Sequence, residues 1–207
     1  MSAVRLHPRL PHMLDLVLGL LIFLSLHLLP TQPAVRAGFV ERFGENAYKG
    51  VFSVLSIVGF AIIIYGYHKL QMNPGKNPVL WDPPTWTKHI SFLLMIPAMI
   101  AIVAAYVPSR IRDVLKHPML VAIKIWALAH LIANGDLASL LLFGSFLAWA
   151  VYDRISLKYR TGGLGPLGDR KGTLTGDIVA VTGGVAAYAF IMLWGHQHLI
   201  GKALIAI

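Results

Sequence analysis

The sequence contains no cysteine, which excludes disulfide bonds, catalytic thiols and cysteine ligands to a metal or a heme. Charge is also scarce: Asp, Glu, Lys and Arg make up 13% of the chain, against about 25% in an ordinary soluble domain. Acidic residues are the rarer sign, 9 against 18 basic residues, which gives a net charge of +9. Hydrophobic residues make up 57% of the chain. This composition indicates a membrane protein rather than a water-soluble domain.

Six apolar segments alternate with short polar connections. The segments that we expect to cross the membrane are Met13–Leu29, Val51–Tyr67, Ile90–Val107, Pro118–Ala133, Leu137–Tyr152 and Ile178–Gly195. The fourth and fifth each give roughly 24 Å of helix, which is short for a hydrocarbon core of about 30 Å. We therefore predict an all-α, polytopic integral membrane protein with a single domain over residues 1–207. It has about six transmembrane helices and a short hairpin between helices four and five.

Smaller features refine this prediction. The segment Val35–Phe43 mixes apolar and charged residues at helical spacing, so we expect it to lie along the membrane interface. The Asn134-Gly135 pair is expected to turn the short hairpin with a positive φ, and Asp136 to cap the helix that follows. The Gly183-Gly184 pair favours close contact between the sixth helix and a neighbour.

Basic residues are distributed unevenly over the connections. One side of the membrane would carry eleven of them: Arg36, Arg42, Lys49, Arg110, Arg112, Lys116, Arg154, Lys158, Arg160, Arg170 and Lys171. The other side would carry six: Arg5, Arg9, Lys69, Lys76, Lys88 and Lys202. The positive-inside rule then places the first, third and fifth connections in the cytoplasm and both termini outside. Because these residues flank apolar segments, their expected partners are membrane lipids and not nucleic acid.

The stretch from Lys116 to Asp136 concentrates polar groups inside an apolar region. Trp126, His130 and Asn134 are spaced four residues apart, so they share one face of a helix. Ionisable groups within a bilayer are costly and usually face a protein interior or a cavity. The spacing therefore predicts a binding site at His130, with an aromatic ring, a ligand and a polar side chain on one face.

The same stretch carries a family resemblance. The run from Trp126 to Asp136, WALAHLIANGD, is followed by Leu142-Phe143-Gly144, and together they resemble the NnrU family of bacterial membrane proteins. His27 and the later segment Gly44-x-x-Ala47-Tyr48-Lys49 extend the resemblance, which covers most of residues 12–155. The 15-cis-zeta-carotene isomerase is similar to this superfamily.

The resemblance implies a cofactor and a location. It implies heme b held by His27 and His130, in a multi-pass protein of the bacterial inner membrane. The isomerase's alternate cysteine ligand corresponds to Ala127, so a ligand exchange of that kind is excluded here. The expected depth of each histidine in the membrane indicates other pairs. His130 should lie at a depth close to that of His196, and His27 at a depth close to that of His117.

A rival interpretation rests on Lys116-His117-Pro118. It resembles the Arg-His-Pro motif with which membrane methyltransferases of the isoprenylcysteine type bind S-adenosylmethionine. The arginine is replaced by Lys116, and the glycine expected a few residues later is missing. A cation cluster at a helix start that meets lipid phosphates accounts for the same residues.

Two classes of function follow from the resemblance. One is a heme-dependent isomerase or redox enzyme, linked to carotenoid isomerisation or to denitrification, acting on an apolar or small-molecule substrate. The other is a non-catalytic accessory or heme-handling protein that serves a respiratory or redox partner. Methyl transfer remains the alternative outside these classes.

Overall fold

The computed structural model describes residues 11–160 and 167–205, and the described chain is helical without a β-strand. The longer helices are α1 (Pro11–Leu28), α3 (Glu45–Met72), α4 (Trp86–Ala104), α6 (Pro118–Ala133), α7 (Leu137–Ser156) and α8 (Leu174–Phe190). Shorter helices are α2 (Pro33–Phe43), α5 (Arg110–Leu115) and α9 (His196–Ile200). Two 3₁₀ turns, Leu29–Thr31 and Pro74–Lys76, and a π-helical turn, Ile191–Gly195, complete the elements.

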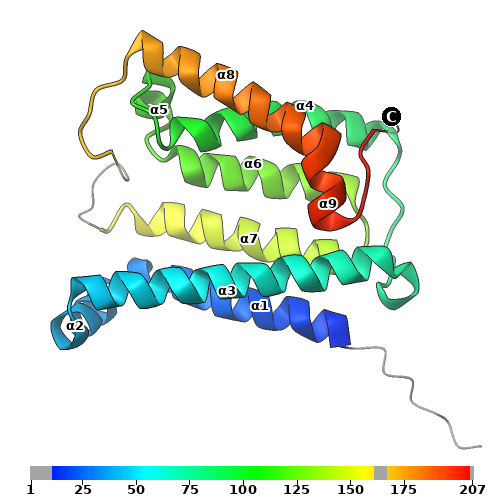
Figure 1. The fold of residues 1–207 in the computed structure, drawn as a ribbon, viewed down its shortest axis with the longest axis horizontal. Coiled ribbons are helices and arrows are strands. Elements are labelled where there is room, and N and C mark those ends of the chain that lie inside the picture. The colour runs from blue at the N-terminus through cyan, green and yellow to red at the C-terminus, as the bar shows by residue number, and fades with distance from the viewer. Residues whose placement is uncertain (1–10, 161–166, 206–207) are drawn as a thin grey trace, which may run out of the picture.

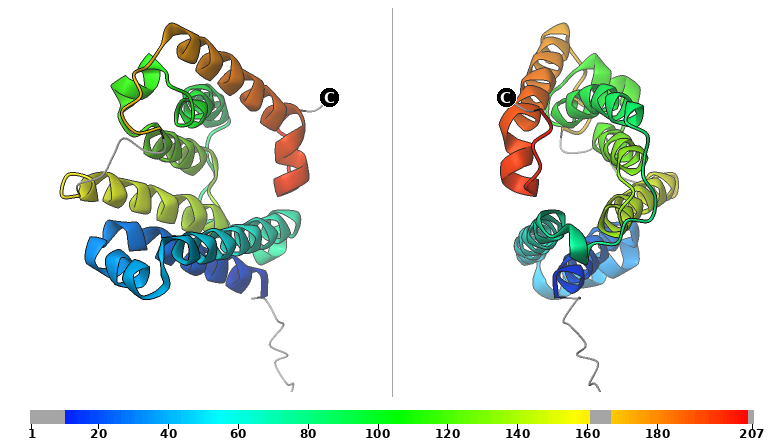
Figure 2. Two further views of the ribbon diagram at one scale, coloured as in Figure 1. Left: turned by 60° about the vertical axis from the view of Figure 1, so that its left-hand side comes forward. Right: turned by 90° about the vertical axis from the view of Figure 1, so that its right-hand side faces the viewer.

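The longer helices run back and forth between two ends of the molecule (Figure 1). One end, here called the His117 end, holds α2, α5, the end of α7 and the start of α8. The other, the Asn134 end, holds residues 73–85, residues 134–136, α9 and the described C-terminal residues. Helix α3 packs on α1, α1 on α7, α7 on α6, α6 on α4, and α4 on α8. The helices therefore form an arc, and α9 contacts α3 across its opening (Figure 2).

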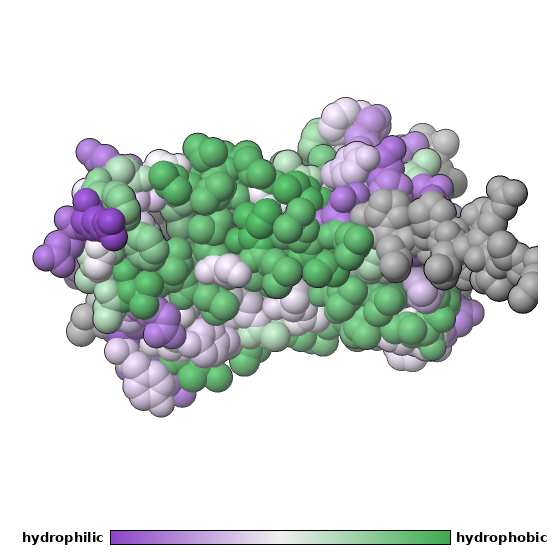
Figure 3. Space-filling model, turned by 90° about the horizontal axis from the view of Figure 1, so that it is seen from below, coloured by the Kyte–Doolittle hydropathy of each residue, from purple (hydrophilic) through white to green (hydrophobic). Residues whose placement is uncertain are grey.

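Five helical segments are long and apolar enough to cross a membrane: His12–Thr31, Glu45–Met72, Trp86–Ala104, Leu137–Ser156 and Leu174–Ile200. The predicted fourth span, α6, has the predicted bounds but only 16 residues, so the count of six stays a prediction. Large apolar side chains cover the outer faces of α1 and α3, among them Leu14, Leu18, Val54 and Ile57. Seen from below, this surface is a hydrophobic band with hydrophilic residues gathered at both ends (Figure 3), as a membrane-crossing protein requires.

Glycines set the closest helix contacts, because no other residue lets two backbones approach so near. A Cβ on Gly184 would lie 2.5 Å from the Ile100 Cα, so the predicted close contact of the sixth span is confirmed, between α8 and α4. A Cβ on Gly66 would lie 2.6 Å from the Leu16 backbone nitrogen, which fixes α3 against α1. A buried apolar core lies between α1, α3, α6 and α7, and contains Leu16, Ile63, Phe143 and Phe146 among others.

Two features of the His117 end can be compared with the sequence analysis. The predicted interfacial segment forms α2, none of whose residues is buried, while its place at a membrane surface stays a prediction. Arg112 lies in the predicted basic connection, and its side chain is buried there, with 1% exposed. Its guanidinium donates to the carbonyls of Gly168 and Arg170, and so fixes the start of α8 to α5. Burial of this cation is compensated by those carbonyl partners.

Candidate functional site

A cavity of about 560 Å³ lies inside the arc of helices, toward the Asn134 end. Its volume falls within the range typical of small-molecule and cofactor sites. Its walls come from α3, α4, α6, α7, α8, the π turn, α9, the connections before α4 and after α6, and the segment after α9. The aromatic, sulfur-bearing and imidazole side chains among the lining residues are Tyr67, Trp81, Phe92, Met95, Met99, Trp126, His130, Phe143, Tyr188, Met192 and His196. Asn134, Gly135 and Asp136 line it as well.

His130 is held rigidly in this cavity. Its Nδ1 donates to the Trp126 carbonyl at 2.8 Å, one helical turn earlier. The ring stacks on Phe143, with centroids 4.4 Å apart and planes inclined by 22°. A carbonyl oxygen can only accept, so in the neutral ring Nδ1 carries the proton and Nε2 keeps a lone pair. This is the arrangement in which a histidine coordinates a metal through Nε2.

His196 lines the same cavity from the far side of the arc. The π-helical turn Ile191–Gly195 directly precedes it, and such turns often occur at functional sites. Its Nδ1 donates to the Lys202 carbonyl at 2.8 Å, so its neutral ring also leaves Nε2 free. The stripe formed with Tyr188 and Met192, which in sequence resembles ordinary helix packing, lies along the cavity wall.

The turn after α6 is built differently from the prediction. Neither Asn134, at φ −130°, nor Gly135 has a positive φ. Gly135 is required for space: a Cβ there would lie 1.9 Å from the Trp81 carbonyl oxygen. The Gly135 carbonyl accepts from the backbone nitrogens of Leu80 and Trp81, so the connection before α4 packs directly on this turn. Asn134 caps α6 by donating its side-chain amide to the His130 carbonyl at 2.9 Å.

Asp136 anchors the Asn134 end through a buried network. As predicted, it caps α7, accepting from the Ser139 nitrogen at 2.9 Å. Its carboxylate also accepts from the Asn77 amide and the Ser139 hydroxyl, each at 2.7 Å. The Tyr67 hydroxyl then donates to the Ser139 oxygen at 2.8 Å, because the Ser139 proton is already committed to Asp136. Tyr67, Asn77 and Ser139 were missed in sequence because their partners lie more than fifty residues away or on another helix.

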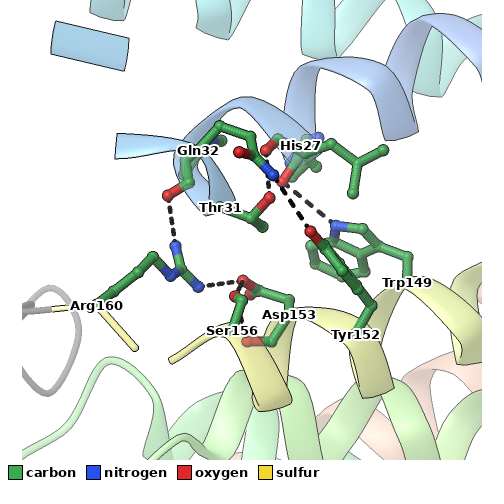
Figure 4. A network of polar contacts seen from close by, with 10 residues as sticks. His27, Thr31, Gln32, Trp149, Tyr152, Asp153, Ser156 and Arg160 are labelled. Atoms are coloured by element: carbon green, nitrogen blue, oxygen red, sulfur yellow. Dashed lines mark hydrogen bonds and ion pairs between the residues drawn. The ribbon is translucent and has the colours of Figure 1, made fainter. Parts of the chain in front are cut away.

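His27 lies outside this cavity. It occupies the last turn of α1, at the His117 end. Its Nδ1 donates to the Phe23 carbonyl at 2.7 Å, and its ring stacks on Phe23 with centroids 4.0 Å apart. Its carbonyl accepts from the Trp149 indole at 3.3 Å. Figure 4 shows this neighbourhood, where Arg160 joins the Pro30 carbonyl to Asp153.

His117 and Lys116 lie at this same end, and neither lines the cavity around His130. Partial burial, and secondarily the charge of Arg154, lower the pKa of His117 below its ordinary value. Lys116 forms a tight turn with φ +62° and ψ −45°, and the His117 nitrogen donates to the Leu115 carbonyl at 2.7 Å across it. This γ-turn is strained for a residue with a Cβ.

The histidines thus lie at two different heights along the helix axes. His27, in the last turn of α1, and His117, at the start of α6, both lie at the His117 end (Figure 1). His130 follows His117 by thirteen residues of α6, or roughly 20 Å of helix. The cavity unites His130, Trp126 and Asn134, as predicted from their spacing, and adds His196. It does not include His27, the ligand that the resemblance pairs with His130.

The donor set fits a heme better than a bare metal ion. Within residues 11–160 and 167–205 there is no cluster of three or more His, Asp or Glu side chains that could hold an ion. Neutral imidazoles with an available Nε2 lone pair, such as those of His130 and His196, are ligands that could hold a heme iron. Aromatic and thioether side chains around them suit the flat apolar ring.

Comparison with known proteins gives one family. The profile of the NnrU protein family matches residues 15–203, which is most of the chain. Neither the curated proteins nor the solved structures compared with this chain gave a match.

Proposed function

This chain belongs to the NnrU family, and from that premise we propose that it is a heme b-binding protein of the bacterial inner membrane. His130 is the central iron ligand and His196 the second. Trp126 and Phe143, which line the cavity, would supply apolar contacts to the group, and Asn134 fixes the end of the helix that carries His130. The observation that carries the proposal is the shared cavity of two histidines, each with Nδ1 bonded to a carbonyl.

The residues around the cavity have separate roles in this proposal. The carbonyls of Trp126 and Lys202 orient the two rings and increase the basicity of their Nε2 atoms. The apolar walls exclude water and control the potential of a redox group held between them. Heme, when bound, supplies electron transfer or reversible coordination of a substrate.

The proposed activity is an isomerase or redox activity of the zeta-carotene isomerase type, or one linked to denitrification, on an apolar or small-molecule substrate. Enclosure by apolar and aromatic walls favours it over a solely structural heme. The S-adenosylmethionine alternative is not carried further, because Lys116 and His117 lie away from this cavity.

The visible spectrum of the purified protein in detergent tests this proposal. The wild type should show a Soret band, and sharp split α and β bands on reduction. His130→Ala should remove the Soret band or shift it strongly. His198→Ala is the matched control: His198 is exposed, stacks on Trp194 and does not line the cavity. A wild type that shows no Soret band after expression with added heme precursor refutes the proposal.

A further inference from the structure

Two lysines line the cavity at the Asn134 end. Lys88 comes from α4 and Lys202 from the segment after α9. Both are exposed, and within the described residues neither lies within ion-pair distance of a carboxylate. Two cations thus stand at the mouth of a cavity whose walls are otherwise largely apolar. Such an arrangement favours a ligand that is apolar along its body and anionic at one end.

The position of Lys88 is unfavourable for the helix that carries it. It lies in the first turn of α4, where the helix dipole is positive, and that turn contains no acidic residue. A cation at a helix N-terminus is unfavourable, because it faces the positive end of the helix dipole. The α4 N-terminus and Lys88 therefore add their positive potentials at the same edge of the cavity.

The position of Lys202 is fixed by the turn that ends α9. Gly201 has φ +85°, and this reverses the chain so that the Lys202 carbonyl accepts from His196 Nδ1. Lys202 therefore stands beside the proposed second iron ligand.

The acidic residues nearby leave this positive charge available. Asp136 lines the cavity, but its carboxylate is already engaged by Asn77, Ser139 and Gln71. Asp82 also lines it and is exposed, without an ion pair to Lys88 or Lys202. Neither acid that lines the cavity therefore pairs with Lys88 or Lys202, and both amines are available to an anionic ligand.

We infer that Lys88 and Lys202 bind carboxylate groups of the cavity ligand, which is therefore an amphipathic molecule with its carboxylates at the Asn134 end. This inference rests on the proposed function, because heme b carries two propionate groups on one edge of an apolar ring. It makes the resident ligand of this cavity an acid and not a hydrocarbon.

Titration of the heme-depleted protein in detergent with hemin and with hemin dimethyl ester tests the inference, because the two ligands differ only in the propionate charges. Soret absorbance and quenching of tryptophan fluorescence report binding. The wild type should bind hemin roughly tenfold more tightly than the ester, since each exposed pairing contributes about threefold.

The Lys88→Gln, Lys202→Gln double variant should lose that preference and bind the ester as the wild type does. Lys76→Gln, an exposed lysine at the same end that does not line the cavity, should change neither affinity.

Other outcomes separate the two proposals. Equal wild-type affinities for hemin and its ester overturn the inference and leave heme binding standing. A double variant that binds both ligands more weakly by the same factor overturns it too, because its lysines then serve the fold or lipid phosphates. If neither ligand binds the wild type, the proposed function fails with it.

Discussion

His130 and His27 make almost the same local contacts in very different surroundings. Each donates Nδ1 to the carbonyl four residues earlier, at 2.8 Å for His130 and 2.7 Å for His27. Each stacks on a phenylalanine, with planes inclined by 22° and 21°. Yet His130 lines a large cavity, whereas His27 is packed among Phe23, Phe52 and Trp149. A helix carbonyl can orient a histidine ring for coordination. That histidine is a candidate ligand only where the neighbouring helices leave space beside it.

The two ends also differ in how they are stabilised. The Asn134 end depends on a close backbone contact at Gly135 and on the buried Asp136 network. The His117 end depends on the buried Arg112, which bonds the carbonyls of Gly168 and Arg170, and on half-buried polar contacts around Asp153 and Arg160. None of these three side chains lines the cavity. Variants at the Asn134 end should therefore affect stability and heme together, and variants at the His117 end should affect stability alone.

The largest effect is expected for Gly135→Val. The new Cβ would meet the Trp81 carbonyl, which is backbone and cannot rotate away. The cost should reach at least about 3 kcal/mol, at the upper end of overpacking effects, and the folded yield in detergent should collapse. Gly144→Ala is the control within the same motif, because a Cβ there meets open space and helix propensity favours Ala by about 0.5–1 kcal/mol. A Gly135→Val protein that unfolds at the wild-type temperature would show that the turn is assigned wrongly.

Asp136→Ala should be the next most damaging change. It removes the cap of α7 and leaves the Ser139 hydroxyl and the Asn77 amide without their acceptor. The combined loss should be about 3 kcal/mol, and heme content should fall with it. Thermal unfolding in detergent and heme per protein measure both effects. Asp82→Ala, an exposed acid at the same end, should leave stability unchanged; equal losses in the two variants would contradict the network's role.

Arg160→Gln tests the His117 end. The guanidinium donates to the Pro30 carbonyl and pairs with Asp153, and both side chains of the pair are about 15% exposed. Loss of these contacts should cost about 1–2 kcal/mol, less than for a fully buried pair. The Soret band should keep its position and intensity, and Lys158→Gln should change neither quantity. A shifted Soret band in Arg160→Gln would mean that the His27 neighbourhood contacts the heme.

The smallest change, a gain, is expected for Lys116→Gly. Glycine adopts φ +62° without the steric cost that lysine bears there. Relief of that strain stabilises the folded protein, while the greater conformational entropy of glycine stabilises the unfolded chain. The net gain in the free energy of unfolding should be about 1 kcal/mol. Lys116→Ala keeps the Cβ and removes the charge, so it should bring no gain. A larger gain from alanine than from glycine would show that charge, and not the turn, is responsible.

Sequence predicted the periodic features well and the long-range ones poorly. The bounds of α6 and the start of α7 are as predicted, because proline at 118 and the Asn134-Gly135-Asp136 turn mark them locally. Helix α3 extends beyond its predicted span at both ends, since polar residues such as Glu45 and Lys69 leave the apolar region without ending the helix. The short helix α5 was missed inside a basic connection.

The site was partly predictable for the same reason. The shared face of Trp126, His130 and Asn134 follows from helical spacing alone. That His196 lines the cavity with His130, and His27 does not, agrees with their depths along the predicted spans. The side from which His196 reaches the cavity depends on the order in which the helices pack, which no local pattern records. The space requirement of Gly135 similarly depends on residues 80–81, which reach the turn from another connection.

The comparison of His196→Ala with His27→Ala, each purified with its heme, tests the central claim most directly. The account predicts that His196→Ala loses the low-spin, six-coordinate spectrum, as His130→Ala does, while His27→Ala keeps the wild-type Soret band and heme content. The opposite pattern, with His27→Ala losing the spectrum and His196→Ala keeping it, would contradict the account and establish the pair that the family resemblance implies.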